Sequence, residues 1–220
     1  MKLFIDTANC SQIEDLNSSY SIDGVTTNPS LMAKEGIEGA QNWLKHYKKI
    51  CNLIKGPVSA EVIATDFETM LLEAYELESL HLNIVVKIPM TKNGIKAIHR
   101  LSAKGIKTNC TLVFTSSQAL LAAKAGATYV SPFIGRLEDV NEDGLALIKQ
   151  IRTIFDNYNF ETQILAASIR NKNHLIKCAE LGADAITAPY SLINELFEHP
   201  LTTKGLKQFL DDYSKLNNSL

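Results

Sequence analysis

Residues 120–132, LLAAKAGATYVSP, and residues 176–189, IKCAELGADAITAP, follow the same pattern. Each begins with a helix-forming segment that stops at a Gly-Ala pair, then continues into a short strand-forming run and ends on proline. Glycine is common just beyond a helix because it tolerates a left-handed backbone. A helix followed by a strand, repeated in this way, is typical of a chain built from β/α units. The two stretches therefore predict an α/β protein with a parallel sheet.

The same alternation extends along the chain. Eight runs are predicted as strands: residues 2–6, 23–26, 57–63, 84–88, 106–112, 128–133, 163–167 and 184–188. Helical segments such as residues 66–79 and 116–125 separate them. The chain has neither a G-x-G-x-x-G motif nor a Walker A loop, so nucleotide-binding doubly wound folds lack their usual sequence support. Eight alternating strands favour a closed (β/α)8 barrel.

We expect residues 1–220 to form one domain. A single α/β barrel commonly has this length, and no proline-rich or Gly/Ser-rich linker divides the chain. Residues 203–216 have the pattern of an additional amphipathic helix at the C-terminus.

The composition excludes several classes of protein. It is 45% hydrophobic and 21% charged, as is usual for globular domains. The 22 Lys and Arg residues against 24 Asp and Glu residues form no basic block, which argues against a nucleic-acid partner. No apolar run approaches the roughly 20 residues of a membrane helix, and the first residues lack the apolar region of a signal peptide. The four scattered cysteines have no metal-binding spacing. We therefore expect a cytoplasmic protein with reduced thiols, no metal and no membrane partner.

The fourth predicted strand carries a charge at its centre. In residues 83–90, NIVVKIPM, Lys87 interrupts an apolar run, although burying an unpaired ammonium group is costly. Other polar residues lie where predicted strands end, which is where a (β/α)8 barrel builds its active site. The candidates near strand ends, with one aromatic side chain among them, are Asp6, Asn28, Glu61, Asn109, Thr111, Ser131, Phe133, Arg136, Ser168 and Arg170.

Taken singly, these residues also have structural explanations. Asp6 could cap a helix, Asn28 could occupy a turn, and the two arginines could be solvated surface charges. Glu61 and Lys87 could form a structural ion pair. Such explanations account poorly for polar residues at the matching ends of several apolar strands, because each buried charge adds its own desolvation cost. An active site is the favoured interpretation.

A lysine in an apolar strand suggests a particular chemistry. Burial disfavours the ammonium form of lysine, and the neutral amine can attack a ketone or aldehyde to form a Schiff base. The protonated imine then accepts electrons while a neighbouring carbon-carbon bond breaks or forms. Asp6 and Glu61 suit proton transfer, and two arginines with the Ser168 hydroxyl suit a phosphate. These residues point to a class I aldolase or aldol transferase that acts on phosphorylated sugars.

The chain resembles the transaldolase family in its short bacterial form. The motifs are FIDTAN (4–9), GVTTNPSL (24–31), SAEV (59–62), VVKIPMT (85–91), KTNCTLVF (107–114), YVSPFIGRLED (129–139), AASIR (166–170) and HPLTTKGLKQF (199–209). The resemblance covers essentially the whole chain in order, and no single motif would suffice. It implies a (β/α)8 barrel whose Schiff-base lysine lies on the fourth strand, at the position of Lys87.

The same resemblance implies roles for the other candidates. Asp6 is expected to be the acid/base that removes the C4 hydroxyl proton, and Glu61 and Thr111 are expected to hold the catalytic water. The residues expected to bind the dihydroxyacetone hydroxyls are Asn28 and Asn109, with Ser131 beside them. Those expected to bind the phosphate are Arg136, Ser168 and Arg170.

The implied reaction transfers a dihydroxyacetone unit from sedoheptulose 7-phosphate to glyceraldehyde 3-phosphate, in the pentose phosphate pathway. It gives erythrose 4-phosphate and fructose 6-phosphate and needs no cofactor or metal, because the imine is the electron sink. The alternatives are fructose 6-phosphate aldolase, which releases free dihydroxyacetone, and a barrel that binds a sugar phosphate without catalysis. That aldolase typically carries Gln and Tyr where this chain has Glu61 and Phe133. Phenylalanine cannot donate a hydrogen bond to water, so both positions favour transaldolase.

Short members of this family often form ring-shaped homo-oligomers, commonly decamers, with the C-terminal helix between neighbours. Residues 203–216 are compatible with that arrangement, although an amphipathic helix can equally pack on its own barrel. We expect a homo-oligomer.

Overall fold

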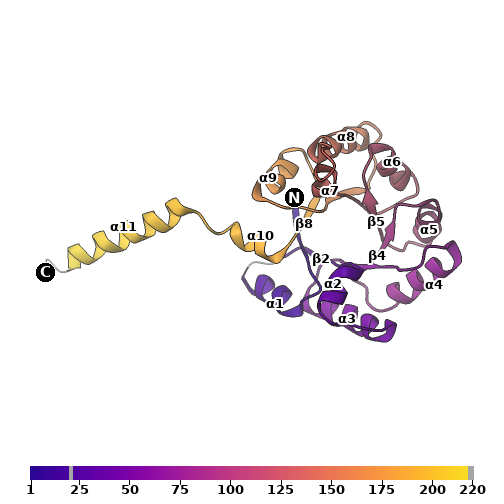
Figure 1. The fold of residues 1–220 in the computed structure, drawn as a ribbon, viewed down its shortest axis with the longest axis horizontal. Coiled ribbons are helices and arrows are strands. Elements are labelled where there is room, and N and C mark those ends of the chain that lie inside the picture. Colours follow the sequence, from indigo (N-terminus) through magenta and orange to yellow (C-terminus); the bar gives the residue numbers. More distant parts are fainter. Residues whose placement is uncertain (20–21, 218–220) are drawn as a thin grey trace.

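Eight parallel strands close into a barrel, hydrogen-bonded in sequence order from β1 to β8 and back to β1 (Figure 1). The computed structural model describes residues 1–19 and 22–217. The strands are β1 (Lys2–Asp6), β2 (Gly24–Thr26), β3 (Val58–Glu61), β4 (Ile84–Pro89), β5 (Thr108–Val113), β6 (Tyr129–Pro132), β7 (Gln163–Ala166) and β8 (Ala185–Ala188). All eight coincide with the expected runs, and β4 and β5 each extend one residue further. The predicted (β/α)8 barrel is confirmed.

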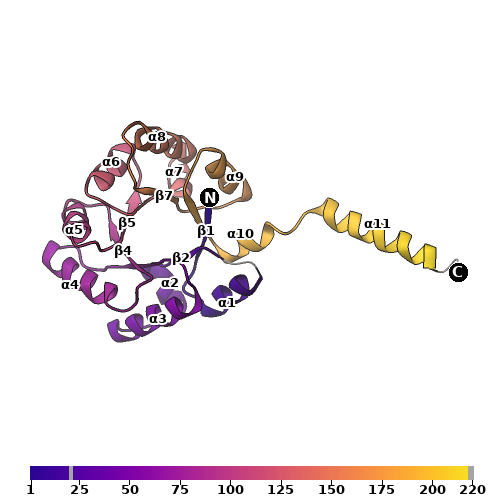
Figure 2. The ribbon, with the colours of Figure 1, turned by 180° about the vertical axis from the view of Figure 1, so that it is seen from behind.

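Helices surround the strands on the outside of the barrel, as the two opposite views show (Figures 1 and 2). They are α1 (Cys10–Ser19), α2 (Pro29–Lys34), α3 (Ala40–Leu53), α4 (Phe67–Glu78), α5 (Lys92–Ser102), α6 (Ser116–Lys124), α7 (Ile134–Glu138), α8 (Gly144–Asn157), α9 (Lys172–Glu180) and α10 (Tyr190–Glu195), followed by α11 (Pro200–Asn217). None of these helices, within the described residues, is both long and apolar enough to span a membrane.

The core has two parts because alternate residues of a strand face opposite sides of the sheet. Outward-facing side chains such as Ile5 and Val86 belong to the large cluster between strands and helices. Inward-facing Phe4, Val85 and Tyr129 form a small separate cluster with Leu165 and Ala185. This inner cluster fills the barrel below the polar ends of the strands.

The two repeated stretches end their helices as expected. Gly126 follows α6 and Gly182 follows α9, with φ of 86° and 81° respectively. A positive φ is strained for other residues, so glycine allows each helix to stop and the chain to turn into the next strand. The Gly-Ala pairs therefore mark real helix ends.

The C-terminal helix α11 projects away from the barrel in both views (Figures 1 and 2). It begins at Pro200, three residues earlier than position 203 expected from the sequence, because proline is favoured in the first turn of a helix. Leu206, Phe209, Leu210 and Tyr213 are 59–74% exposed. In this structure α11 does not cover its own barrel.

Candidate active site

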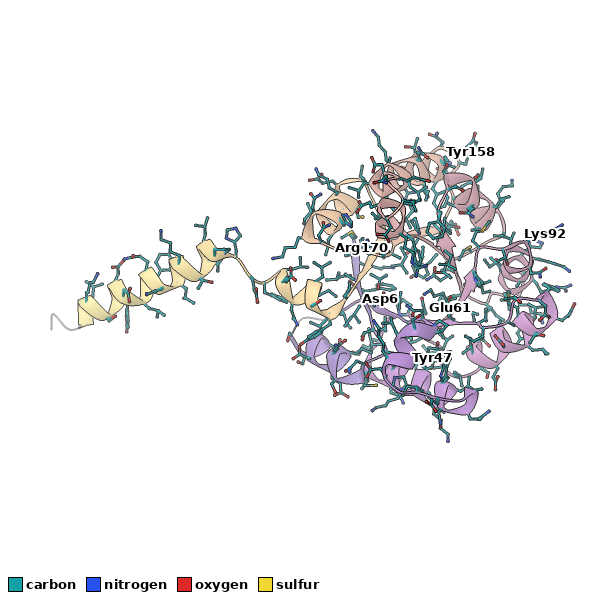
Figure 3. The ribbon with its side chains drawn as sticks, in the orientation of Figure 1. Asp6, Tyr47, Glu61, Lys92, Tyr158 and Arg170 are labelled. Carbon is teal, nitrogen blue, oxygen red and sulfur yellow. The ribbon has the colours of Figure 1, made fainter. Side chains whose placement is uncertain are left out.

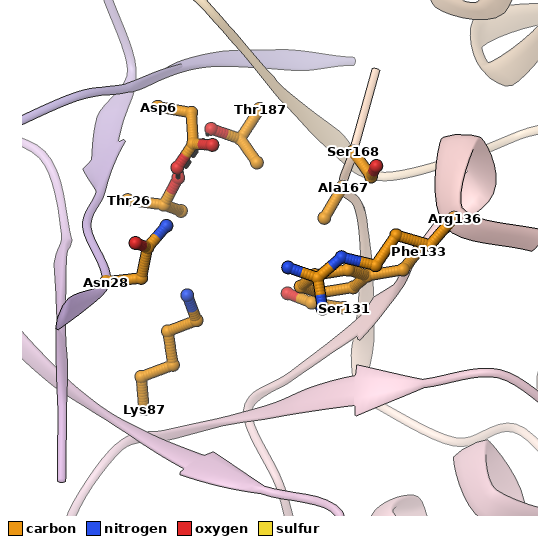
Figure 4. Close-up of a pocket in the computed structure, with 10 residues that line it drawn as sticks. All are labelled: Asp6, Thr26, Asn28, Lys87, Ser131, Phe133, Arg136, Ala167, Ser168 and Thr187. Carbon is orange, nitrogen blue, oxygen red and sulfur yellow. Dashed lines mark hydrogen bonds between the residues drawn. The ribbon is translucent and has the colours of Figure 1, made fainter. Parts of the chain in front are cut away.

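A cavity of about 110 Å³ opens at the C-terminal ends of the strands. Its lining residues are Asp6, Thr26, Asn28, Lys87, Ser131, Phe133, Arg136, Ala167, Ser168 and Thr187 (Figure 4). Seven of the residues proposed from the sequence are therefore brought together. Glu61, Asn109, Thr111 and Arg170 do not line this cavity.

Strand register places three polar side chains side by side. Glu61 on β3 is paired with Lys87 on β4, and Lys87 is paired in turn with Asn109 on β5. All three side chains face the inside of the barrel, because alternate residues of a strand face opposite sides of the sheet. Cys110, next to Asn109, faces the outer core, as predicted. Figure 3 shows Asp6 and Glu61 inside the ring of strands, whereas Lys92 and Tyr158 lie on its outside.

Lys87 is 5% exposed and has one ion-pair partner and one hydrogen-bond acceptor. Its Nζ lies 3.0 Å from Glu61 Oε2 and donates a hydrogen bond to the Thr27 carbonyl at 2.8 Å. The structural ion pair considered from the sequence is therefore present. Lys87 nevertheless extends into the cavity (Figure 4), so its amine is accessible to a small molecule bound there. The Glu61 carboxylate lies close enough to this amine for a proton to pass between them.

Tyr47 of α3 supports this pair from outside the barrel. Its buried hydroxyl accepts a hydrogen bond from the Glu61 backbone N–H at 3.4 Å. The Thr27 hydroxyl lies 3.4 Å from the same oxygen and also donates to the Ser59 carbonyl at 2.8 Å. Tyr47 thus connects the segments that carry both partners of Lys87.

Asp6 faces a chain of hydroxyl groups. Thr26 Oγ1 donates to Asp6 Oδ1 at 2.8 Å and lies 2.6 Å from Thr187 Oγ1. Thr26 has one hydroxyl proton, so while it donates to the carboxylate, Thr187 must donate to Thr26. If Asp6 becomes protonated, the direction of the chain can reverse.

Burial raises the pKa of Asp6 above its ordinary value. The charge of Lys87 and the Thr26 hydrogen bond oppose this effect without cancelling it. A carboxyl group with a raised pKa is suited to both accepting and donating a proton. The environment of Asp6 therefore fits acid/base chemistry.

Sequence reasoning missed Thr26 and Thr187. Both are polar residues near the end of a strand, with side chains that face the inside of the barrel. Asn109 was identified from the sequence by the same two features. The signal was present in the sequence, but threonine is common in strands and so attracts less notice than a charge.

Asn109 and Ser131 are joined beside Lys87. The Ser131 hydroxyl donates to Asn109 Oδ1 at 2.8 Å, and Asn109 Nδ2 donates to Ser59 Oγ at 3.2 Å. Both ends of the Asn109 amide thus have partners. Thr111 differs, because its buried hydroxyl has no hydrogen-bond partner among the described residues. Buried hydroxyls are normally paired. Because the Thr111 hydroxyl is not, it can bind a water or a substrate oxygen.

The Asn28 side chain caps helix α2 and also lines the cavity. Its side-chain oxygen accepts the Leu31 N–H at 3.0 Å and caps α2, so the turn explanation is correct in part. The oxygen is therefore occupied, and the Asn28 amide nitrogen points toward the cavity (Figure 4). This nitrogen is available as a hydrogen-bond donor.

The two arginines behave differently. Arg136 on α7 lines the cavity, with its guanidinium 4.9 Å from the centre of the Phe133 ring. Ser168 lies opposite on the loop after β7 with a φ of 58°, an unusual backbone conformation for serine. Arg170 instead forms a double ion pair with Asp139 at the surface, and its hydrogen bonds lower the pKa of that carboxyl group. The surface-charge explanation describes Arg170 here, whereas Arg136 and Ser168 form a polar end of the cavity.

The cysteine thiols and the side chains that commonly bind metals were the other candidates for a reactive centre. The four cysteines are free, and burial raises the pKa of Cys51, Cys110 and Cys178 to about 12, which keeps these thiols protonated. Within residues 1–19 and 22–217, no group of three His, Cys, Asp or Glu side chains could hold a metal ion. Among the described residues that line the cavity, Lys87 is the one that carries an amine.

Comparisons with known proteins agree with this chemistry. Residues 3–220 match the family described as Transaldolase/Fructose-6-phosphate aldolase. Proteins named "Probable transaldolase" from Phocaeicola vulgatus, Bacteroides fragilis and Cytophaga hutchinsonii are each 59% identical to this chain over 217 residues. These alignments cover 99% of this chain and all of each relative. With a cavity that combines a buried lysine and an acid/base carboxyl group, this chain belongs to the transaldolase/fructose-6-phosphate aldolase family of enzymes.

Proposed function

We propose that this protein is a transaldolase that passes a dihydroxyacetone unit from sedoheptulose 7-phosphate to glyceraldehyde 3-phosphate. The proposal includes the pentose phosphate pathway as its setting and residues 1–220 as a single-domain enzyme. Its main support is that Lys87, which lines the cavity together with Asp6, lies 3.0 Å from the Glu61 carboxylate. The names of the relatives support the same activity.

In the proposed mechanism, Lys87 first forms the Schiff base. Glu61 takes a proton from the Lys87 ammonium, and the neutral amine adds to the C2 carbonyl carbon of the ketose. The resulting carbinolamine loses water to give an iminium ion. The Thr111 hydroxyl, which has no hydrogen-bond partner among the described residues, is proposed to hold that water with Glu61.

Asp6 then acts on the carbon-carbon bond. It removes the proton from the C4 hydroxyl, the C3–C4 bond breaks, and its electron pair moves into the iminium to leave an enamine on Lys87. The aldehyde product departs. The enamine attacks the carbonyl carbon of the acceptor aldehyde, Asp6 returns its proton to the new hydroxyl, and water hydrolyses the iminium. When Asp6 gains or loses its proton, the hydrogen bonds of the Thr26 and Thr187 hydroxyls change direction.

Polar groups around the cavity are proposed to fix the substrate. The Asn28 amide nitrogen and the Asn109–Ser131 pair are suited to the dihydroxyacetone hydroxyls. Arg136 and Ser168 are suited to the phosphate. Arg170 would join them only after releasing Asp139.

Phe133 supports transfer over release. It lines the cavity and has no hydroxyl with which to position a water near the enamine. A retained enamine waits for an acceptor aldehyde, whereas a protonated one releases dihydroxyacetone. The aldolase activity of the same family is the second candidate function, and the family match includes it by description.

A product assay with fructose 6-phosphate separates these activities. With erythrose 4-phosphate present, we expect sedoheptulose 7-phosphate and glyceraldehyde 3-phosphate to form. Without an acceptor, free dihydroxyacetone should appear at least about tenfold more slowly, a difference of about 1.4 kcal/mol in the barrier. Equally fast release without acceptor would assign the aldolase. No product under either condition would assign a barrel that only binds sugar phosphates.

A matched pair of variants tests the part played by Phe133. Phe133→Tyr adds a hydroxyl inside the cavity and should increase dihydroxyacetone release relative to transfer. Phe114→Tyr adds the same group to the neighbouring ring, whose centre is 5.8 Å away and which does not line the cavity, and should leave the ratio unchanged.

We further propose that the enzyme works in the cytoplasm as a homo-oligomer. The free cysteines support a reducing compartment. The exposed apolar side chains of α11 support association between copies of the chain, because a large exposed apolar face is unusual in a monomer. A decamer is the size expected from the family resemblance.

A further inference from the structure

A second cavity lies at the opposite, N-terminal mouth of the barrel and has a volume of about 480 Å³. Its lining includes Lys2, Lys55, Lys107, Tyr129 and Gln163. Lys2 and Gln163 are the first residues of β1 and β7, and Lys107 immediately precedes β5. The strands that end at the Lys87 cavity therefore begin at this one.

The alternation of the strands directs two of these lysines inward. Lys2 shares its face of β1 with Phe4 of the inner cluster and with Asp6. Lys107 is two residues before the inward-facing Asn109, so its side chain is on the same face as Asn109 and Thr111. The inner cluster containing Phe4 and Tyr129 separates the two mouths. This cavity is thus distinct from the active site.

The side chains that line this mouth carry net positive charge. No aspartate or glutamate is among the residues that line the cavity. Lys2 Nζ contacts the neutral Gln163 amide oxygen at 3.1 Å, and Lys55 and Lys107 have no ion-pair partner in the described parts of the chain. Three ammonium groups around one cavity, with no carboxylate among its described lining residues, favour an anion.

The nearby carboxylates are already engaged. Asp184 lies 3.2 Å from Arg152 Nη1 and accepts the Ile164 N–H at 2.7 Å. Asp23 accepts the Leu3 N–H at 2.8 Å. Asp184 is thus paired with a cation, whereas Asp23 accepts from a neutral N–H and keeps its negative charge near Lys2. The three lysines outnumber this one carboxylate.

Tyr129 supplies an unused polar group. It is only 5% exposed, and its ring packs edge-on against Phe4 with the ring centres 6.1 Å apart. Its hydroxyl is open to the cavity and has no hydrogen-bond partner among the residues described. Because Tyr129 lines the cavity, a ligand bound there is within the reach of this donor.

We propose that the N-terminal mouth binds a compact diphosphate anion. Two linked phosphate groups carry several negative charges and many acceptor oxygens, which match three lysines and one hydroxyl donor. Lysine binds phosphate as a point charge and does not require a fixed bidentate geometry. The cavity volume lies within the range of ordinary small-molecule sites.

Calorimetric titration with inorganic pyrophosphate tests this site. The titration is made on the full chain carrying Arg136→Gln, which weakens phosphate binding at the active site. Saturable binding is expected to remain. Adding Lys107→Gln should weaken it about tenfold, and adding Tyr129→Phe about fivefold, because each removes one donor to an anion. Lys48→Gln removes an exposed lysine from α3 and should leave the affinity unchanged.

Three results would overturn the proposal. The first is that neither the wild type nor Arg136→Gln binds pyrophosphate saturably. The second is that the wild type binds it and Arg136→Gln does not. The third is that adding Lys107→Gln or Lys48→Gln to Arg136→Gln gives the same affinity. Lys107 is exposed, so its variant is expected to fold, and an unchanged unfolding temperature checks this. Lys107→Gln alone should keep wild-type turnover, so a failed diphosphate site and a failed active-site assignment are separable.

Discussion

At the scale of single residues, the contacts of Lys87 modify the argument from its sequence neighbours. Its neighbours on β4 are apolar, but the Glu61 carboxylate lies 3.0 Å from the Lys87 nitrogen and the Thr27 carbonyl accepts a hydrogen bond from it. The proton therefore has a defined destination when the amine becomes a nucleophile. Glu61 is more than a neutralising charge, because it lies within hydrogen-bond distance of the nitrogen that must lose the proton.

Replacing Asp6 by Asn should stabilise the protein and abolish most of its activity. Burial raises the pKa of Asp6 in the folded state, so the native protein holds this proton over a pH range in which the unfolded chain has lost it. Stability accordingly falls as pH rises through that range from about 3.8 upward. Asn removes the buried charge and should raise the unfolding temperature by about 2 °C or more at pH 8.

The gain from Asp6→Asn should disappear near pH 3, where the carboxyl group is neutral in both states. A gain that is the same at pH 3 and pH 8 would show that desolvation of the Asp6 charge is not its cause. Turnover should fall by about 10²-fold or more, the usual contribution of a positioned acid/base. Wild-type turnover would remove Asp6 from that role.

Candidate residues could be singled out from the sequence where a side chain breaks the pattern of its strand. Lys87, Asp6 and Glu61 are conspicuous because charges in apolar strands need a reason. The Thr27 carbonyl could not be found in this way, because every residue has one and only the folded barrel brings it within 2.8 Å of Lys87. Arg170 had the expected residue type and position, but its pairing with Asp139 depends on where α7 ends, which the sequence did not reveal.

At the scale of elements, the short helix α7 fixes the phosphate end of the cavity. Its Gly135 N–H donates to the Ser168 carbonyl at 3.0 Å, and the Ile134 N–H donates to the Ala167 carbonyl at 3.0 Å. These bonds hold Arg136 opposite Ser168. A Cβ on Gly135 would lie 2.5 Å from the Ser168 carbonyl oxygen, too close for the loop to keep its place.

Gly135→Ala should therefore impair binding of the phosphorylated substrate. We expect KM for fructose 6-phosphate to rise by about tenfold with a smaller change in kcat, because the Schiff-base residues lie on other strands. Overpacking of this kind typically costs about 1–3 kcal/mol of stability. Gly205→Ala on α11 is the matched control, since a Cβ there meets nothing within 4 Å. Equal KM values in the two variants would contradict the role given to α7.

The long elements were easier to predict than the short ones. Strands and helices with clear periodicity, such as α4 and α6, matched their expected ranges to within about a residue at each end. The six-residue helices α2 and α10 and the five-residue α7 were not predicted, because they are too short to show a period. The short α7 nevertheless positions Arg136.

At the scale of the whole molecule, α11 is the part that its own barrel does not stabilise. Leu206, Phe209, Leu210, Tyr213 and Leu216 follow a three- and four-residue spacing and form one apolar face. A helix of this kind gains stability mainly by packing that face against another surface. A second copy of the chain is the occupant proposed above.

Disrupting the α11 face should reduce the size of the assembly. The double variant Phe209→Asp/Tyr213→Asp places two charges where apolar contact is required, and sedimentation velocity should show a smaller species than wild type. Lys207→Asp and Gln208→Asp change neighbouring positions outside that face and together serve as the control. An unchanged sedimentation coefficient in the Phe209/Tyr213 variant would exclude α11 as the contact.

The central claim is that Lys87 forms the covalent link to substrate, and borohydride trapping tests it most directly. Borohydride reduces an imine to a stable amine, so treatment in the presence of fructose 6-phosphate should leave an adduct on the enzyme. Peptide mass spectrometry should place the adduct on Lys87 and on no other lysine. Asp6→Asn should still be labelled, because Asp6 acts after the imine forms, whereas Lys87→Met should not. An unmodified Lys87 peptide in the wild-type enzyme, or an adduct on another lysine, would contradict the account.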